Sequence, residues 1–326
     1  MTTMSLGKAL NSGLRRAMEH DPQVVLMGED IGKLGGVFRV TEGLQRDFGD
    51  RRVIDTPLAE SGVIGTAVGL AVRGYRPVCE IQFDGFVYPA FDQIVSQVAK
   101  LRYRNEGRLA VPLTIRVPFG GGVGAVEHHS ESPEAYFAHT AGLRVVTPSN
   151  AADGYRMIQQ AIASDDPVVF FEPKRRYWEK GEVDGDGTVA DTALHRAAVL
   201  SPGTDVTVVS YGPLVATALQ AASIGRGEGT SIEVIDLRSL SPIDFETIEA
   251  SVRKTGRLVV AHEASVFCGV GAEIAARVSE RCFFHLEAPV RRVGGFATPY
   301  PASRAERHFV PDADRILHEV DRCLQP

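Results

Sequence analysis

The hydrophobic positions in the first half of the chain alternate between short apolar runs and longer repeats at helical spacing. Near the N-terminus, Leu6, Leu10, Leu14, Ala17 and Met18 fall on one face and predict an amphipathic helix. The short runs are rich in Val and Ile, as buried strands are. We expect strands over 24–28, 52–56, 77–83, 113–117, 143–147 and 167–171, and helices over 60–73, 89–104 and 150–164. This alternation predicts a mostly parallel sheet covered by helices.

The pattern breaks over 179–193, where the residues are acidic, contain glycine and show no periodicity, which predicts an exposed linker. A second alternation follows it. Its strands are expected over 205–211, 232–237, 257–263 and 290–294, and its helices over 214–224, 244–255, 271–282 and 312–324. The sequence therefore predicts an α/β protein of two domains, over 1–185 and 196–326, as a length of 326 residues also suggests.

Composition narrows the classes of partner. The chain carries 35 Lys and Arg against 41 Asp and Glu, a net charge of −6, so bulk electrostatics favours neither nucleic acid nor an anionic membrane. No apolar stretch is long enough to span a membrane, and the N-terminus lacks the apolar core of a secretory signal. Cys79, Cys268, Cys282 and Cys323 form no C-x-x-C pair. We expect a cytoplasmic chain with reduced cysteines.

The segment TPLAESG (56–62) places a carboxylate at a strand-to-helix junction. Pro57 turns the chain after a predicted strand, and Glu60 opens the next helix. Glu60 could simply complement the positive end of the helix dipole. Alternatively, it lies at the carboxyl edge of a parallel sheet, where α/β folds bind ligands.

A second candidate is the stretch PFGGGVGAVEHHSESPEAYFAHT (118–140), which begins with a glycine-rich segment. Its glycines permit a sharp loop, but their spacing fits neither G-x-G-x-x-G nor a P-loop. His128 and His129 follow at adjacent positions, which suits chelation from one helix face poorly. The pair is either part of a solvated loop or, since it follows a strand and a glycine loop, a site of acid–base chemistry.

The basic run Lys174, Arg175 and Arg176 ends the last predicted strand of the first half. Three adjacent cations could mark a phosphate or nucleic-acid patch. In a chain of net charge −6, a salt-bridged surface between subunits is the better interpretation.

Several of these segments together resemble the beta subunit of the thiamine-diphosphate-dependent 2-oxo acid dehydrogenases, the decarboxylating components of the pyruvate and branched-chain complexes. The resemblance covers nearly the whole chain. It is carried by 28–44, 55–71, 80–104, 114–149 and 166–178, and extends into the second domain through 205–212 and 233–244.

The resemblance implies an α2β2 heterotetramer in which thiamine diphosphate is shared between alpha and beta subunits. The alpha subunit would supply the groups that hold the diphosphate and Mg²⁺. A GDG triplet at 185–187 resembles such a motif, but the motif needs a later Asn, and the last Asn here is Asn150. The missing diphosphate motif is therefore what the resemblance implies for a beta subunit.

The same resemblance assigns the pyrimidine side of the site to this chain. Glu60 would bond a ring nitrogen of the aminopyrimidine and favour the tautomer that takes part in proton transfer. Leu58 and Gln82 would line the pocket, and Phe86 would pack on the ring. His129 matches the family histidine at the mouth of the site, which implies proton transfer during decarboxylation or acylation of the lipoyl group.

The family also holds a structural potassium ion, mainly through backbone carbonyls. The resemblance places this ion near Leu113, Thr114 and Ala161. The chain departs from the family at Ser164, where some members have Asp, and this departure puts the potassium site in question.

The second domain resembles the C-terminal domain of transketolase-like enzymes. In the family this domain makes beta–beta contacts and binds the lipoyl acyltransferase core. The sequence is thus interpreted as the beta subunit of a branched-chain 2-oxo acid dehydrogenase, with the pyruvate enzyme as the open alternative. A non-catalytic docking subunit is disfavoured because Glu60 and His129 are both present, and a stand-alone transketolase-like enzyme lacks its diphosphate motif.

Overall fold

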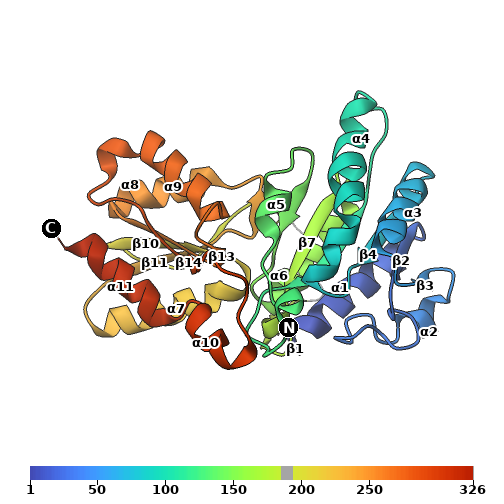
Figure 1. Ribbon diagram of the computed structural model, residues 1–326, viewed down its shortest axis with the longest axis horizontal. Coiled ribbons are helices and arrows are strands. Elements are labelled where there is room, and N and C mark those ends of the chain that lie inside the picture. Colours follow the sequence, from blue (N-terminus) through green and yellow to red (C-terminus); the bar gives the residue numbers. More distant parts are fainter. Residues whose placement is uncertain (185–193, 326) are drawn as a thin grey trace.

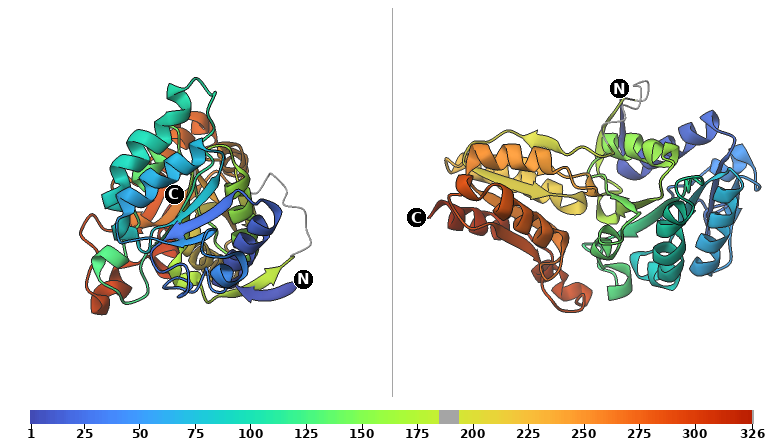
Figure 2. Two further views of the ribbon diagram at one scale, coloured as in Figure 1. Left: turned by 90° about the vertical axis from the view of Figure 1, so that its right-hand side faces the viewer. Right: turned by 90° about the horizontal axis from the view of Figure 1, so that it is seen from above.

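This computed structural model describes residues 1–184 and 194–325. Within these ranges the fold is built on two large sheets, each covered by helices on both faces, and a small two-stranded sheet accompanies the first (Figure 1). The two sheets lie side by side along the long axis of the molecule (Figure 2). The helices are α1 (Leu6–His20), α2 (Leu44–Phe48), α3 (Glu60–Val72), α4 (Ala99–Arg104), α5 (Glu134–Ala138), α6 (Ala151–Ala163), α7 (Val215–Gly227), α8 (Phe245–Thr255), α9 (Val270–Arg281), α10 (Glu306–Phe309) and α11 (Ala313–Leu324). No helix within these ranges is both long and apolar enough to cross a membrane.

The first sheet has seven strands in the order β12-β6-β7-β5-β4-β2-β3, and only β12 runs antiparallel to its neighbour. Its strands are β2 (Val24–Gly28), β3 (Val53–Asp55), β4 (Arg76–Glu80), β5 (Thr114–Phe119), β6 (Arg144–Val146), β7 (Val168–Pro173) and β12 (Ser239–Ser241). The predicted parallel sheet is confirmed, and the carboxyl ends of β4, β2 and β3 meet at one edge.

Alternate residues of each strand enter different cores, since neighbouring side chains of a strand point to opposite faces. Leu26 packs with the buried face of α1 and with α6, whereas Met27 belongs to the core that contains α3. The helical face predicted for α1 is confirmed, because Leu6, Leu10 and Leu14 are buried.

The second sheet has five strands in the order β14-β13-β10-β11-β9. They are β9 (Ala198–Ser201), β10 (Val206–Ser210), β11 (Ile232–Asp236), β13 (Leu258–Ser265) and β14 (Arg291–Gly295). The helices α7 and α11 pack on one face, and α8 and α9 pack on the other. The buried cluster that includes α8 and α9 also includes Val117 and Phe119 of β5, so the two halves share one hydrophobic core.

Two local predictions are wrong. Lys180–Val183, expected in the linker, forms strand β8 and pairs antiparallel with β1 (Thr2–Ser5), because the N-terminal strand offers it a backbone ladder. The segment 89–104 is not one α-helix. Its first two residues end a 3-10 helix, η1 (Asp84–Ala90), and the chain then winds as a π-helix, η2 (Gln93–Val98), before α4. Pro89 has no N–H with which to extend an α pattern. The rest of the linker and the GDG triplet lie at 185–193, outside the described residues.

Candidate active site at the carboxyl edge of the first sheet

Three neighbouring parallel strands bring polar side chains to the same edge. Glu29 and Asp30 follow β2, Glu60 opens α3 after β3, and Gln82 follows β4. Gln82 Nε2 donates to Asp30 Oδ2 at 3.4 Å, so the segments after β2 and β4 are in direct contact. The edge where α/β sheets bind ligands therefore carries both a predicted carboxylate and a predicted amide.

Glu60 is half-buried at the first position of α3, with Ala59 as the N-cap. Burial raises the pKa of Glu29, and the negative charges of Asp30 and Glu60 raise it further. The charges of Asp30 and Glu60 thus lie close enough to act on the carboxyl of Glu29. Leu58, two residues before Glu60, is 66% exposed, so an apolar side chain lies open to solvent beside an acidic cluster.

The predicted aromatic residue and the predicted histidine meet. The rings of Phe86 and His129 are 5.2 Å apart at their centroids and nearly perpendicular. The ring of Phe83 stacks on the imidazole of His129, with centroids 3.9 Å apart and planes at 7°.

 The imidazole of His129 thus faces the ring of Phe83 and meets Phe86 edge-on, which holds it beside the segment that follows β4.

The ring nitrogens of His129 differ in their surroundings. Nδ1 lies 2.8 Å from the backbone carbonyl oxygen of His128. When Nδ1 carries the proton, it donates to this carbonyl and leaves Nε2 able to accept a proton. His128 is more open, with 52% of its side chain exposed, and it lies beside Glu127. Of the two histidines, His129 is the one that the fold orients.

A buried ion pair fixes the base of the loop that carries His129. Lys174 Nζ donates to Asp84 Oδ1 at 2.6 Å, and both side chains are fully buried. Asp84 Oδ2 accepts the backbone N–H of Glu131 at 2.7 Å, and the carbonyl of Glu131 accepts the N–H of Gly120 at 2.8 Å. Burial raises the pKa of Asp84 to about 6, and the charge of Lys174 limits the rise. The two ends of the loop are therefore tied to each other and to a charged pair in the first domain.

A second buried set of charges crosses the three strands next to the site. Arg116 on β5 donates to both carboxylate oxygens of Glu172 on β7, at 2.6 and 2.9 Å. Its third contact is with Glu80 on β4, at 2.6 Å. Bidentate pairs of this kind fix geometry strongly. Because Glu80 ends β4, the triad also sets the point from which the chain continues to Gln82.

The basic run of the first domain makes its contacts inside the chain. Lys174 pairs with Asp84, Arg175 pairs with Glu263 of the second domain at 2.8 Å, and Arg176 donates to the carbonyl of Pro213. The expected salt bridges exist, but their assignment to a surface between subunits is wrong. The reason is that the run ends β7 at the junction of the two domains, where buried partners lie within reach.

The residues proposed for potassium lie where α6 ends and β5 begins. The carbonyl of Leu113 accepts the N–H of Val168 at 2.9 Å, and that of Ala161 accepts the N–H of Ser164 at 3.3 Å. Thr114, the first residue of β5, is buried. The guanidinium of Arg76 also lies at the end of α6, where its Nη1 donates to the carbonyl of Ser164 at 3.1 Å. The potassium site stays a prediction.

Sequence reasoning missed three residues of the site. Glu29 and Asp30 directly follow a buried strand, which is the same signal that drew attention to Glu60. Phe83 follows β4 by a few residues, but nothing in the local pattern indicated that it would stack on a histidine from another loop. Within the described ranges, no group of three or more His, Cys, Asp or Glu residues is arranged to hold a metal ion.

The fold and the edge site define a two-domain protein of the transketolase class. The model of the transketolase pyrimidine-binding domain matches residues 2–179, and that of the transketolase C-terminal domain matches residues 195–316. A solved split-gene transketolase, described as an inactive beta4 tetramer, superposes with a TM-score of 0.81 at 25% identity and covers 98% of each chain.

Curated relatives narrow this class. A Leifsonia xyli protein named pyruvate dehydrogenase E1 component subunit beta is 59% identical over 99% of this chain and 95% of its own length. A Mycobacterium tuberculosis 3-methyl-2-oxobutanoate dehydrogenase subunit beta is 53% identical over 99% and 92%. A Pseudomonas aeruginosa 2-oxoisovalerate dehydrogenase subunit beta is 48% identical over 100% and 96%. The chain belongs to this family of beta subunits of the pyruvate and branched-chain 2-oxo acid dehydrogenases.

Proposed function

We propose that the chain is the beta subunit of a branched-chain 2-oxo acid dehydrogenase. With an alpha subunit, it decarboxylates a 2-oxo acid oxidatively and passes the acyl group to a lipoyl group on the acyltransferase. The observation that carries this proposal is the placement of Glu60 and Gln82 after the carboxyl ends of β3 and β4, the two strands that flank β2. Relatives named after both 2-oxo acid classes support it.

The side chains at this edge fit an aminopyrimidine ring. The ring needs a carboxylate for one nitrogen, a polar partner at its rim and apolar groups for its faces. Glu60 is a half-buried carboxylate, Gln82 presents an amide, and Leu58 and Phe86 offer apolar surface. When bound, thiamine diphosphate supplies the electron sink for decarboxylation.

The residues of this chain have separate tasks in the proposal. Glu60 holds and exchanges a proton at its carboxylate, in the partly buried setting that makes such exchange efficient. Leu58, Gln82 and Phe86 orient the ring and exclude water from it. His129 accepts or donates a proton at Nε2 when the acyl group moves to the lipoyl group.

The assembly around this chain is part of the same proposal. An alpha subunit holds the diphosphate and Mg²⁺, and two copies of each chain form an α2β2 heterotetramer in the cytoplasm. The pyrimidine-binding domain spans 1–185. The C-terminal domain, 196–326, carries the contact with the acyltransferase core. A potassium ion near Leu113, Thr114 and Ala161 would stabilise the first domain.

The pyruvate dehydrogenase beta subunit is the second candidate. The specific observation in its favour is the 59% identity to the Leifsonia xyli protein of that name, against 53% for the Mycobacterium tuberculosis protein. The two candidates share every residue assigned above, so they differ only in the acyl group that the complex accepts.

Reconstitution with the cognate alpha subunit tests the proposal. The assay compares kcat/KM for pyruvate and for the three branched 2-oxo acids, with thiamine diphosphate, Mg²⁺ and a lipoyl domain present. We expect the highest kcat/KM with a branched substrate. A preference for pyruvate would select the second candidate, and a well-formed complex that decarboxylates none of the four would refute both.

A further inference from the structure

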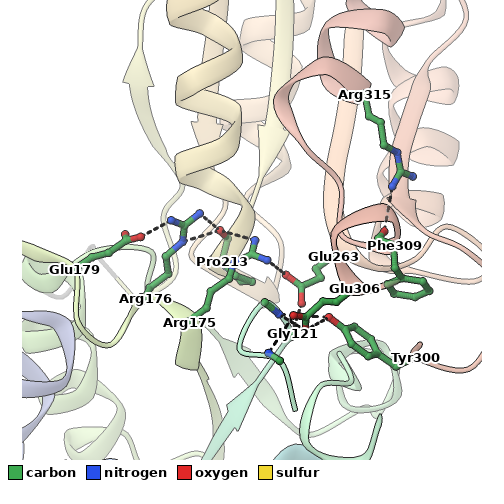
Figure 3. A network of polar contacts seen from close by, with 12 residues as sticks. Gly121, Arg175, Arg176, Glu179, Pro213, Glu263, Tyr300, Glu306, Phe309 and Arg315 are labelled. Carbon is green, nitrogen blue, oxygen red and sulfur yellow. Dashed lines mark hydrogen bonds and ion pairs between the residues drawn. The ribbon is translucent and has the colours of Figure 1, made fainter. Parts of the chain in front are cut away.

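The glycine-rich loop that leads to His129 is held at its crown, residues 121–124, by a carboxylate from the second domain (Figure 3). Glu306, the first residue of α10, accepts the N–H of Gly122 at 2.7 Å through Oε1 and that of Gly124 at 3.0 Å through Oε2. Tyr300 donates its hydroxyl to Oε1 of Glu306 at 2.7 Å. Glu306 is only 9% exposed, so these bonds form largely away from water.

A second carboxylate holds the neighbouring peptide of the same loop. Glu263, which is 3% exposed, accepts the backbone N–H of Gly121. Its other oxygen pairs with Arg175 at 2.8 Å, and Arg175 also donates to the carbonyl of Pro213. Successive backbone N–H groups that converge on carboxylates form an anion-binding nest, here filled by the chain's own side chains.

The glycines are needed for this contact. A Cβ at Gly121 would lie 1.7 Å from the hydroxyl oxygen of Tyr300, so Tyr300 would have to move away from its place beside the loop. Gly122 has φ = +83°, in the left-handed region that favours glycine. The loop sequence therefore suits close approach to the second domain.

The loop is fixed from two sides. Its base is tied within the first domain through Gly120, Glu131 and Asp84, and its crown is tied to the second domain through Glu306 and Glu263. His129 lies in the turn η3 (Glu127–His129), between the crown and the base. The second domain can therefore set the position of a side chain that packs on the first.

We propose that Glu306 and Glu263 are positioning residues that hold the His129 loop in the arrangement used for acyl transfer. The inference rests on the role given to His129 in the proposed function. The second domain then contributes to the reaction indirectly. Its two carboxylates hold the loop that carries His129 and do not themselves contact the site.

Glu306→Gln tests the inference in the reconstituted complex. An amide of the same size turns one acceptor oxygen into an NH₂ group, which faces a backbone donor at Gly122 or Gly124. We expect faster hydrogen exchange across 118–131 and a loss of acyl transfer to the lipoyl domain on the order of tenfold to a hundredfold, as for a catalytic group displaced by about 1 Å. Decarboxylation measured with an artificial electron acceptor should keep its rate and its KM for the 2-oxo acid.

A double variant shows whether the effect passes through His129. In a His129→Ala background, Glu306→Gln should cause no further loss of acyl transfer, because residues that act through one group are not additive. An additive loss would overturn the inference. Tyr300→Phe, which removes one donor to Glu306, should loosen the loop in the same direction and serves if Glu306→Gln folds poorly.

Arg238→Gln is the matched control. Arg238 Nε pairs with Asp153 Oδ2 across the same domain boundary at 2.9 Å, away from the loop. The Arg238→Gln variant should leave hydrogen exchange over 118–131 unchanged. A rise in exchange equal to that in Glu306→Gln would overturn the inference. A wild-type complex that acylates no lipoyl domain would refute the proposed function, whereas unchanged exchange in both Glu306→Gln and Tyr300→Phe would refute the inference.

Discussion

The imidazole of His129 lies flat against the ring of Phe83, with centroids 3.9 Å apart and planes at 7°. The stack joins the loop after β5 to the segment after β4, which also carries Gln82 and Phe86. A histidine held in this way keeps one ring orientation, and its Nδ1 lies beside the backbone carbonyl of His128. The pyrimidine side of the proposed site and its proton-transfer residue are therefore parts of one packed unit.

His129→Ala should impair acyl transfer to the lipoyl domain far more than decarboxylation. Loss of a positioned acid–base group costs about 10²–10⁴-fold in the step that it serves. Single-turnover acylation of a lipoyl domain measures that step. His128→Ala is the matched control, because His128 is more exposed and should be replaceable with little effect. Equal losses in the two variants would assign both histidines to loop structure.

Glu60→Gln should abolish most decarboxylation while leaving the complex assembled. The amide keeps the size of the side chain but cannot hold and return a proton, so we expect a loss of about 10²–10⁴-fold. CO₂ release by the reconstituted complex measures the loss, and analytical ultracentrifugation checks assembly. Near-normal turnover in a correctly assembled Glu60→Gln complex would remove Glu60 from the mechanism.

Lys174→Met should destabilise the first domain. The variant leaves the carboxylate of Asp84 buried without its cation, and breaking a buried pair of this kind costs about 3–5 kcal/mol. The free energy of unfolding in urea measures the effect. Arg108→Gln provides the comparison, since Arg108 and Glu106 form an exposed pair whose loss should leave the free energy unchanged. Similar results for the two variants would contradict the structural role given to Lys174.

Glu134 should make stability depend on pH. Burial raises its pKa from 4.5 to about 7, and its Oε1 accepts the hydroxyl of Tyr211 at 2.7 Å. Because the folded pKa lies above the unfolded one, the contribution of this group is full below pH 4.5 and is lost as the pH rises through about 7.

The matched variant for this effect is Glu134→Gln, which keeps the acceptor for Tyr211 but cannot ionise. Its stability relative to the wild type should rise by roughly 2–3 kcal/mol between pH 5 and pH 8. Urea unfolding of both proteins at several pH values gives the difference. A difference that does not change with pH would show that Glu134 is not held neutral by its buried setting.

The sequence predicted those parts of the fold that depend on local pattern. The buried strands β2, β5 and β7 appear as apolar runs, and Asn150 caps α6 by accepting the N–H of Asp153 at 3.0 Å. The strand β8 was missed because it is mostly polar and is defined by its pairing with β1. A pairing partner far away in sequence leaves no local signal.

The residues of the site also divide into those with a local sequence signal and those whose contacts depend on distant parts of the chain. Glu60 was identifiable because a strand, a proline and a helix start within a few residues, and this junction alone places it at the sheet edge. Glu306 was not, because its partners Gly122 and Gly124 lie more than 180 residues earlier in the chain. Only the packing of the second domain against the first brings these atoms together.

The central claim is that this chain supplies half of a thiamine diphosphate site. Calorimetric titration of thiamine diphosphate with Mg²⁺ tests it most directly, using this chain alone, the alpha subunit alone and the mixture. The account predicts tight binding in the mixture and weak binding to this chain by itself. Tight Mg²⁺-dependent binding to the isolated chain would contradict it.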